Sequence, residues 1–87
     1  QFYPARRNKL LEAISKMIIP VENKLQVKGV VSPHAGYIYS GQVAGRVFSN
    51  IKIPETVVIL GPNHNGIGKP YAVMPRGKWL MPMGEVE

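Results

Sequence analysis

Residues 56–64, Thr-Val-Val-Ile-Leu-Gly-Pro-Asn-His, are the stretch of the chain that decides its fold. The first five side chains are β-branched or apolar without a charged break, which is typical of a strand buried on both faces of a parallel sheet. A Gly-Pro-Asn turn follows at once. We therefore expect a central strand over residues 56–60, with His64 in the loop just beyond its carboxyl end.

The residues before this stretch predict a second strand and the helix that joins the two. Residues 27–31 contain three valines and are expected to form the strand, with Gly29 as its weak point. Ser40 is expected to cap the connecting helix. The apolar stripe of that helix is made by Val43, Ala44, Val47, Phe48 and Ile51.

The two ends of the chain carry weaker signals. Asn8 is expected to cap an N-terminal helix that Pro20 ends. Residues 71–74 are a candidate third strand. Residues 75–87 are punctuated by Pro and Gly and contain no expected closing element.

Strand, helix and strand in this order make one βαβ unit of an α/β fold. Two or three strands cannot bury the faces of a parallel sheet by themselves. We therefore expect residues 1–87 to be the N-terminal portion of one larger α/β domain, contributing a βαβ part of a mostly parallel sheet with flanking helices. The first residue is Gln1 and not Met, so an earlier start is expected.

Composition narrows the class of protein and its partners. The chain has 87 residues, 45% hydrophobic side chains and a net charge of +6. Its basic residues are scattered singly apart from Arg6-Arg7, so a dedicated nucleic-acid surface is not expected. No apolar run approaches the roughly 20 residues that a membrane-spanning helix needs. The absence of cysteine suits a cytoplasmic protein.

The two histidines of the chain occupy matching positions. His34 comes three residues after Val31, and His64 comes four residues after Leu60. Ligands in open α/β sheets bind beyond the carboxyl ends of the strands, so both imidazoles are candidate metal ligands at one edge of the sheet. The alternative is that each histidine only forms hydrogen bonds within its own loop.

A complete metal site needs further ligands. Zinc in catalytic sites takes three protein ligands, and non-haem iron commonly takes two histidines and a carboxylate. The five glutamates of the chain lie outside the strand-end loops that we expect. The third ligand is therefore expected from outside this chain, from Glu85 or Glu87 folding back, or from water.

Three further residues are candidates for contacts to a substrate or anion. Tyr37 could orient a substrate, Ser40 opens a helix whose N–H groups attract anions, and Asn63 stands beside His64. Each also has a plain structural explanation: packing for Tyr37, an ordinary helix cap for Ser40, and an Asx-type turn for Asn63.

The motifs together resemble the Memo-like family. Phe2-Tyr3-Pro4 is similar to its opening motif, residues 33–41 to its signature loop, and Gly61-Pro62-Asn63-His64 to its second histidine loop. The turn that follows is matched by Gly77, Trp79, Pro82 and Gly84, although Met81 and Met83 replace the usual threonine and leucine.

The resemblance carries expectations about fold and chemistry. It implies a fold similar to class III extradiol dioxygenases, with His34 and His64 in the two histidine positions of a metal site. The metal is expected to be iron or copper, with zinc as the third option, and the family's third ligand is a cysteine that lies further along its chain than Glu87. Family members are also longer, so the rest of the domain or an oligomeric partner is expected to complete the site.

Two classes of function are compatible with these residues, and a third interpretation is that the chain has no activity by itself because only half of the site is present. The first is a metal-binding protein with redox or dioxygenase-like chemistry, which would make it a non-haem metal-dependent oxidoreductase. The second is a non-enzymatic scaffold that binds an anionic ligand or a peptide in the same cleft. Metal retention favours the first, and salt-sensitive ligand binding without metal favours the second.

Overall fold

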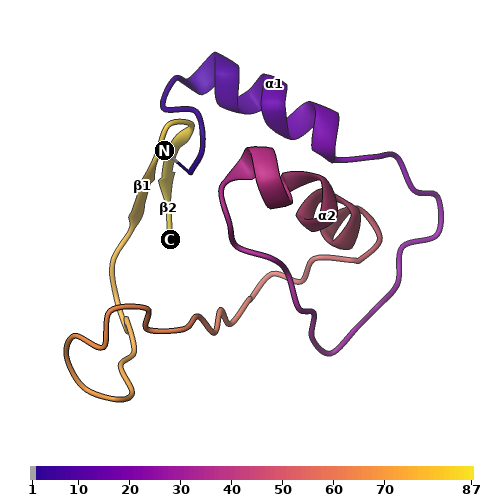
Figure 1. Ribbon diagram of the computed structural model, residues 1–87. Helices are drawn as coiled ribbons and strands as arrows, with labels where there is room; N and C mark the ends of the chain where they lie inside the picture. The colour runs from indigo at the N-terminus through magenta and orange to yellow at the C-terminus, as the bar shows by residue number, and fades with distance from the viewer. Residues whose placement is uncertain (1) are drawn as a thin grey trace.

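The computed structural model describes residues 2–87 and contains two helices and one hairpin. Helix α1 spans Arg7–Met17 and helix α2 spans Tyr37–Ser49. Strands β1 (Trp79–Met81) and β2 (Gly84–Val86) pair antiparallel, with Leu80 opposite Glu85. Figure 1 shows α1 crossing above α2, with the hairpin beside the N-terminal part of α1. The described residues thus form a small α/β unit.

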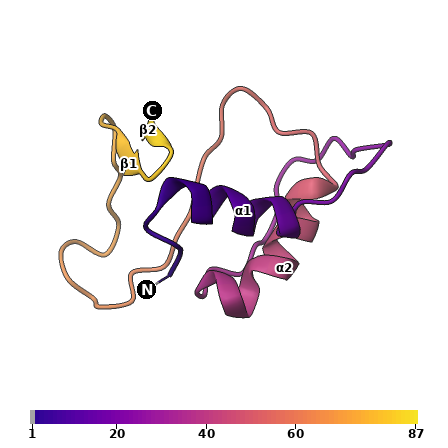
Figure 2. The same ribbon diagram turned by 90° about the horizontal axis from the view of Figure 1, so that it is seen from above.

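The two helices approach each other closely at Met17. A Cβ built on Gly45 would overlap the backbone carbonyl of Met17, so glycine is needed there for the helices to touch. The Ile19 N–H donates to the Ser49 hydroxyl at 2.9 Å, which ties the chain leaving α1 to the end of α2. Figure 2 shows the same crossing from above. Among residues 2–87, Leu10 is the one buried hydrophobic side chain, so the core is small.

Both helices were predicted, but their starts were misplaced. The cap of α1 is Arg6 and not Asn8, and no side chain caps it. The cap of α2 is Gly36, so Ser40 lies inside the first turn, where its hydroxyl donates to the Ala35 carbonyl at 2.9 Å. The helix gains one more turn because the Gly36 carbonyl accepts the first intrahelical bonds without help from a side chain.

The strands differ more from the sequence prediction. Residues 27–31, 56–60 and 71–74 lie outside the strands, and the expected parallel sheet is absent from the described chain. One parallel bridge remains, between Leu25 and Ile51. The hairpin was not predicted. It forms because Gly84, at a φ of +135°, permits a tight reversal after Pro82 and Met83. No helix between residues 2 and 87 is long and apolar enough to cross a membrane.

Helix α1 carries a cluster of three charged side chains, Lys9, Glu12 and Lys16. From this cluster we predict an effect of pH on the stability of the helix. The Glu12 carboxylate accepts a hydrogen bond from Lys16 at 3.3 Å and lies 3.6 Å from the Lys9 ammonium. Both partners hold the pKa of Glu12 below its usual range. A carboxyl with a depressed pKa in the folded state adds stability above its unfolded pKa, and that stability is lost as pH falls through the folded value.

We expect this contribution to be small, because Glu12 is fully exposed and exposed ion pairs add little. The helical circular dichroism signal should fall slightly as pH drops from neutral into the acidic range where Glu12 titrates. A Glu12→Gln variant should lose that part of the pH dependence. If the helical signal of the variant falls at acidic pH as much as that of the unmodified protein, other carboxyls cause the fall.

Candidate metal centre

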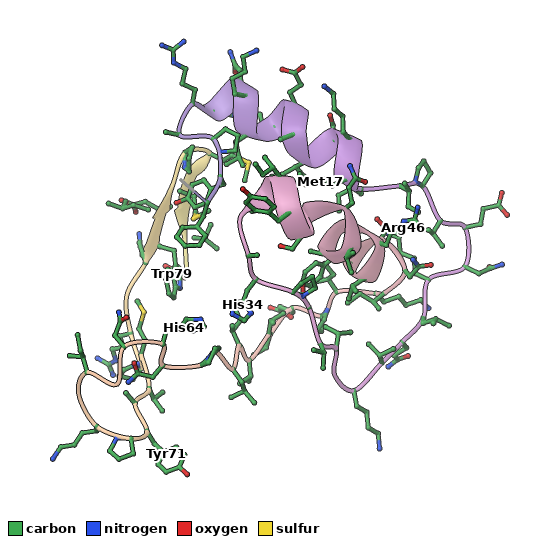
Figure 3. All side chains as sticks on the ribbon, in the orientation of Figure 1. Met17, His34, Arg46, His64, Tyr71 and Trp79 are labelled. Atoms are coloured by element: carbon green, nitrogen blue, oxygen red, sulfur yellow. The ribbon has the colours of Figure 1, made fainter. Side chains whose placement is uncertain are left out.

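His34 and His64 meet in the structure although they are 30 residues apart. Their Nε2 atoms are 3.2 Å apart, and their ring centroids are 5.2 Å apart with the planes tilted by 36°. Figure 3 shows the two side chains pointing toward one another, one from the loop before α2 and the other from the loop after residues 56–60. Two ligands of one metal ion must converge in this way, and the distance between the ring nitrogens agrees with that requirement.

This separation is compatible with one shared metal ion. With metal–nitrogen bonds of about 2.0–2.1 Å, two nitrogens 3.2 Å apart subtend an angle of about 100° at the metal. Octahedral and tetrahedral sites require about 90° and about 109°. The same separation also suits a hydrogen bond in which one neutral imidazole donates to the other. Both side chains are exposed, so either arrangement is open to exchange with solvent.

Asn63 shapes the loop that carries His64. Its side-chain oxygen accepts hydrogen bonds from the Gly66 N–H at 2.9 Å and the Asn65 N–H at 3.3 Å. Its side-chain nitrogen donates to the Ile67 carbonyl at 2.9 Å. Asn63 therefore forms the Asx-type turn that was one of its two interpretations. Its polar atoms are engaged within the loop, and a direct contact to a ligand stays a prediction.

The loop that carries His34 is anchored where it enters α2. The Tyr37 N–H donates to the Phe2 carbonyl at 2.8 Å, and the Tyr37 ring lies 5.9 Å from the Tyr3 ring, centroid to centroid. Ser40 bonds to Ala35, the residue next to His34. These contacts hold the approach of the chain to α2, so Tyr37 and Ser40 have structural roles. Substrate contacts by either residue stay predictions.

A cleft of about 500 Å³ opens beside His34, between α1, α2 and the loop over residues 32–35. Its wall is largely apolar and includes Phe2, Met17 and Phe48. His34, Tyr37 and Ser40 all line this cleft, whereas Asn63 does not. No sequence pattern indicates that Phe2 and Met17 face the same space, because that depends on how α1 crosses α2.

The described residues offer two candidate ligands and not three. Between residues 2 and 87, no group of three or more His, Cys, Asp or Glu side chains is placed to hold a metal ion. Glu85 is 3.2 Å from the Lys78 ammonium within the hairpin, and Glu12 is paired on α1. Any further ligand to a metal at His34 and His64 would have to be water or a group from beyond these residues.

These features define a small α/β chain with two histidines in contact, His34 in the loop after residues 27–31 and His64 in the loop after residues 56–60. The chain belongs to the Memo-like family, whose model, described as Memo-like protein, matches residues 1–87. A MEMO1 family protein of Thermotoga maritima is 49% identical over 100 residues, covering 98% of this chain and 36% of that relative.

Relatives from other lineages agree with this assignment. A MEMO1 family protein of Archaeoglobus fulgidus is 49% identical over 86 residues, covering 99% of this chain and 32% of its own length. One of Aquifex aeolicus is 45% identical over 89 residues, covering 99% and 33%. The chain therefore spans about a third of the length of these curated relatives. No solved structure matches the chain.

Proposed function

We propose that this chain provides two histidine ligands, His34 and His64, to a non-haem metal site of a Memo-like protein. The 3.2 Å separation of their Nε2 atoms carries the proposal, because it suits two ligands on adjacent coordination positions. Iron or copper is the favoured metal, with zinc as the third option. Imidazole nitrogen serves all three, and nothing in residues 2–87 offers the thiolates of a structural zinc cage.

The chemistry follows from the small number of protein ligands. A bound iron or copper ion supplies Lewis acidity and redox capacity at coordination positions that the protein leaves open. The two imidazoles fix one side of the site, and the apolar cleft beside His34 would exclude water from a substrate held there. Tyr37 and Ser40 are proposed to contact that substrate, and their presence in the lining of the cleft supports this role. The proposed activity is that of a metal-dependent oxidoreductase, dioxygenase-like in its ligand set.

The proposal includes the fold and location of the whole protein. We propose a class III extradiol dioxygenase-like, mostly parallel sheet in which residues 27–31 and 56–60 become neighbouring strands. The parallel bridge between Leu25 and Ile51 supports this, because it runs the two segments in the same direction. A cytoplasmic location is proposed on the absence of cysteine.

Metal analysis tests the proposal directly. The purified protein is loaded anaerobically with iron, copper or zinc, desalted, and its metal content measured beside a His34→Ala/His64→Ala double variant. We expect about one metal ion per chain, lost in the double variant because no second pair of histidines exists. Asn65→Ala is the matched control, an exposed neighbour of His64 that should retain the metal. Equal metal content in the double variant would refute the proposal.

A second candidate function rests on the cleft and the net charge. A protein of charge +6 with an open cleft at His34 could bind an anionic ligand or a peptide without any metal. An affinity for the anionic ligand or peptide that is unchanged by a metal chelator and falls steeply with salt concentration would favour this scaffold role. Affinity or redox activity that disappears on chelation would favour the metal site.

A further inference from the structure

The dipeptide Asn65-Gly66 comes directly after His64, and the Asn65 side chain has no role in the site described above. Asn65 is exposed, and within residues 2–87 only its backbone N–H, not its side chain, takes part in a hydrogen bond. Gly66 has a φ of +65°, and a Cβ built on it would meet no atom within 4 Å. An unengaged side-chain amide is therefore followed by a peptide nitrogen that no side chain shields.

This arrangement permits an intramolecular deamidation. The Gly66 nitrogen loses its proton and attacks the Cγ atom of Asn65, the bond from Cγ to Nδ2 breaks, and the amide group leaves as ammonia with that proton. Water then opens the resulting succinimide ring at one of its two carbonyls, which yields aspartate or isoaspartate at position 65. Water is the only co-reactant, so the reaction needs neither an enzyme nor an oxidant.

The other four asparagines of the chain are less suited to this reaction. They are Asn8, Asn23, Asn50 and Asn63. Each precedes a residue with a long or bulky side chain, whereas glycine allows the close approach that ring closure needs. The side-chain nitrogens of Asn50 and Asn63 are also engaged, since each donates to a backbone carbonyl. We therefore expect Asn65 to react first.

The Asn63 side chain restrains the attacking nitrogen. Its Oδ1 atom accepts the Gly66 N–H at 2.9 Å and the Asn65 N–H at 3.3 Å. The Gly66 nitrogen must leave this hydrogen bond before it can lose its proton and attack Asn65. The net strength of one such bond corresponds to a rate that is about three- to tenfold lower.

We propose that Asn65 is a site of spontaneous deamidation whose rate is set by the hydrogen bond from Gly66 to Asn63. The product places a carboxylate beside His64, in a loop over residues 61–70 that has no acidic side chain, and lowers the net charge of +6 by one. The isoaspartyl form also lengthens the main chain by one carbon directly after His64. The reaction is independent of metal binding, so this proposal can fail or succeed separately from the proposed metal site.

Peptide mapping by mass spectrometry tests the location of the reaction. The metal-free protein is incubated at neutral pH over weeks and digested, and the peptides are fragmented by a method that distinguishes aspartate from isoaspartate. We expect both products at position 65 before any product at the other four asparagines. Asn65→Gln is the matched control: it retains a side-chain amide, but its longer side chain closes the ring much more slowly, so position 65 should stay unmodified.

Variants of Asn63 test the restraint. Asn63→Ala should deamidate at position 65 about three- to tenfold faster than the unmodified protein, whereas Asn63→Asp, which retains the acceptor, should not be faster. In urea the unmodified protein and Asn63→Ala should react at the same rate, because the turn is lost on unfolding. Three results would each overturn the proposal: no product at position 65 in Asn63→Ala, equal rates for the two folded proteins, or a difference that persists in urea.

Discussion

A Gly45→Ala substitution should destabilise the helix pair although alanine is the better helix former. On helix propensity alone the change would stabilise by about 1 kcal/mol. The new Cβ, however, would overlap the backbone carbonyl of Met17, which cannot rotate away as a side chain can. Forcing extra volume into such a contact typically costs about 1–3 kcal/mol. Set against the gain in helix propensity, this leaves a net loss of up to about 2 kcal/mol, measured by urea unfolding followed through the helical signal.

Gly41→Ala is the matched control, because it lies one turn earlier on the same helix. A Cβ at Gly41 would come 2.6 Å from the Sδ and Cε atoms of Met17, which belong to the flexible end of that side chain. Met17 can adopt another rotamer, so we expect Gly41→Ala to be neutral or mildly stabilising. A stabilised Gly45→Ala protein would show that the helices do not touch at Met17.

The helices of this fold could be predicted because their signals are local. Apolar side chains recur at helical spacing in both segments, and α1 and α2 form where that spacing places them. Their first residues could not be predicted, because Arg6 and Gly36 act as caps through the backbone alone. Ser40 and Asn8 have the side chains that usually cap helices, but both lie within the helices.

The strands depend on neighbours, and this explains where the prediction was wrong. Residues 56–60 have the composition of a central strand, but a strand requires partners for its backbone groups. Residues 2–87 supply one parallel bridge, at Leu25 and Ile51, and no parallel ladder. The hairpin of β1 and β2 needs no distant partner. The sequence prediction included a turn that contains Pro82 and Gly84 but no strand on either side of it.

The candidate site was more predictable than the sheet. Each histidine was expected just after an apolar segment, and the structure brings them together even though those segments are not paired as strands. What the sequence could not distinguish was a residue that contacts a ligand from one that holds a loop. Ser40 and Asn63 bond to the loops of His34 and His64, and only the three-dimensional arrangement reveals those partners.

Removal of the Asn63 side chain should therefore weaken metal binding without removing a ligand. Asn63→Ala deletes the bonds to the backbone of Asn65, Gly66 and Ile67, which leaves the His64 loop free to move. A histidine whose position is no longer fixed must be ordered on binding, and loss of such supporting contacts typically costs about 10–100-fold in metal affinity. We expect a loss in this range in a metal titration, with Asn65→Ala unchanged because no hydrogen bond uses its side chain.

Asn63→Asp separates a supporting role from direct contact with an anionic ligand. The aspartate retains the acceptor for Gly66 and Asn65 but loses the donor to Ile67. If Asn63 acts by holding the loop, metal affinity should lie between those of the unmodified protein and Asn63→Ala. If Asn63 instead touches an anion, the added negative charge makes Asn63→Asp the weaker binder of that anion.

Cross-relaxation between the rings of His34 and His64 in the metal-free protein reports loop order independently, and it should weaken in Asn63→Ala. An undiminished signal together with full metal affinity would show that the loop holds His64 without Asn63.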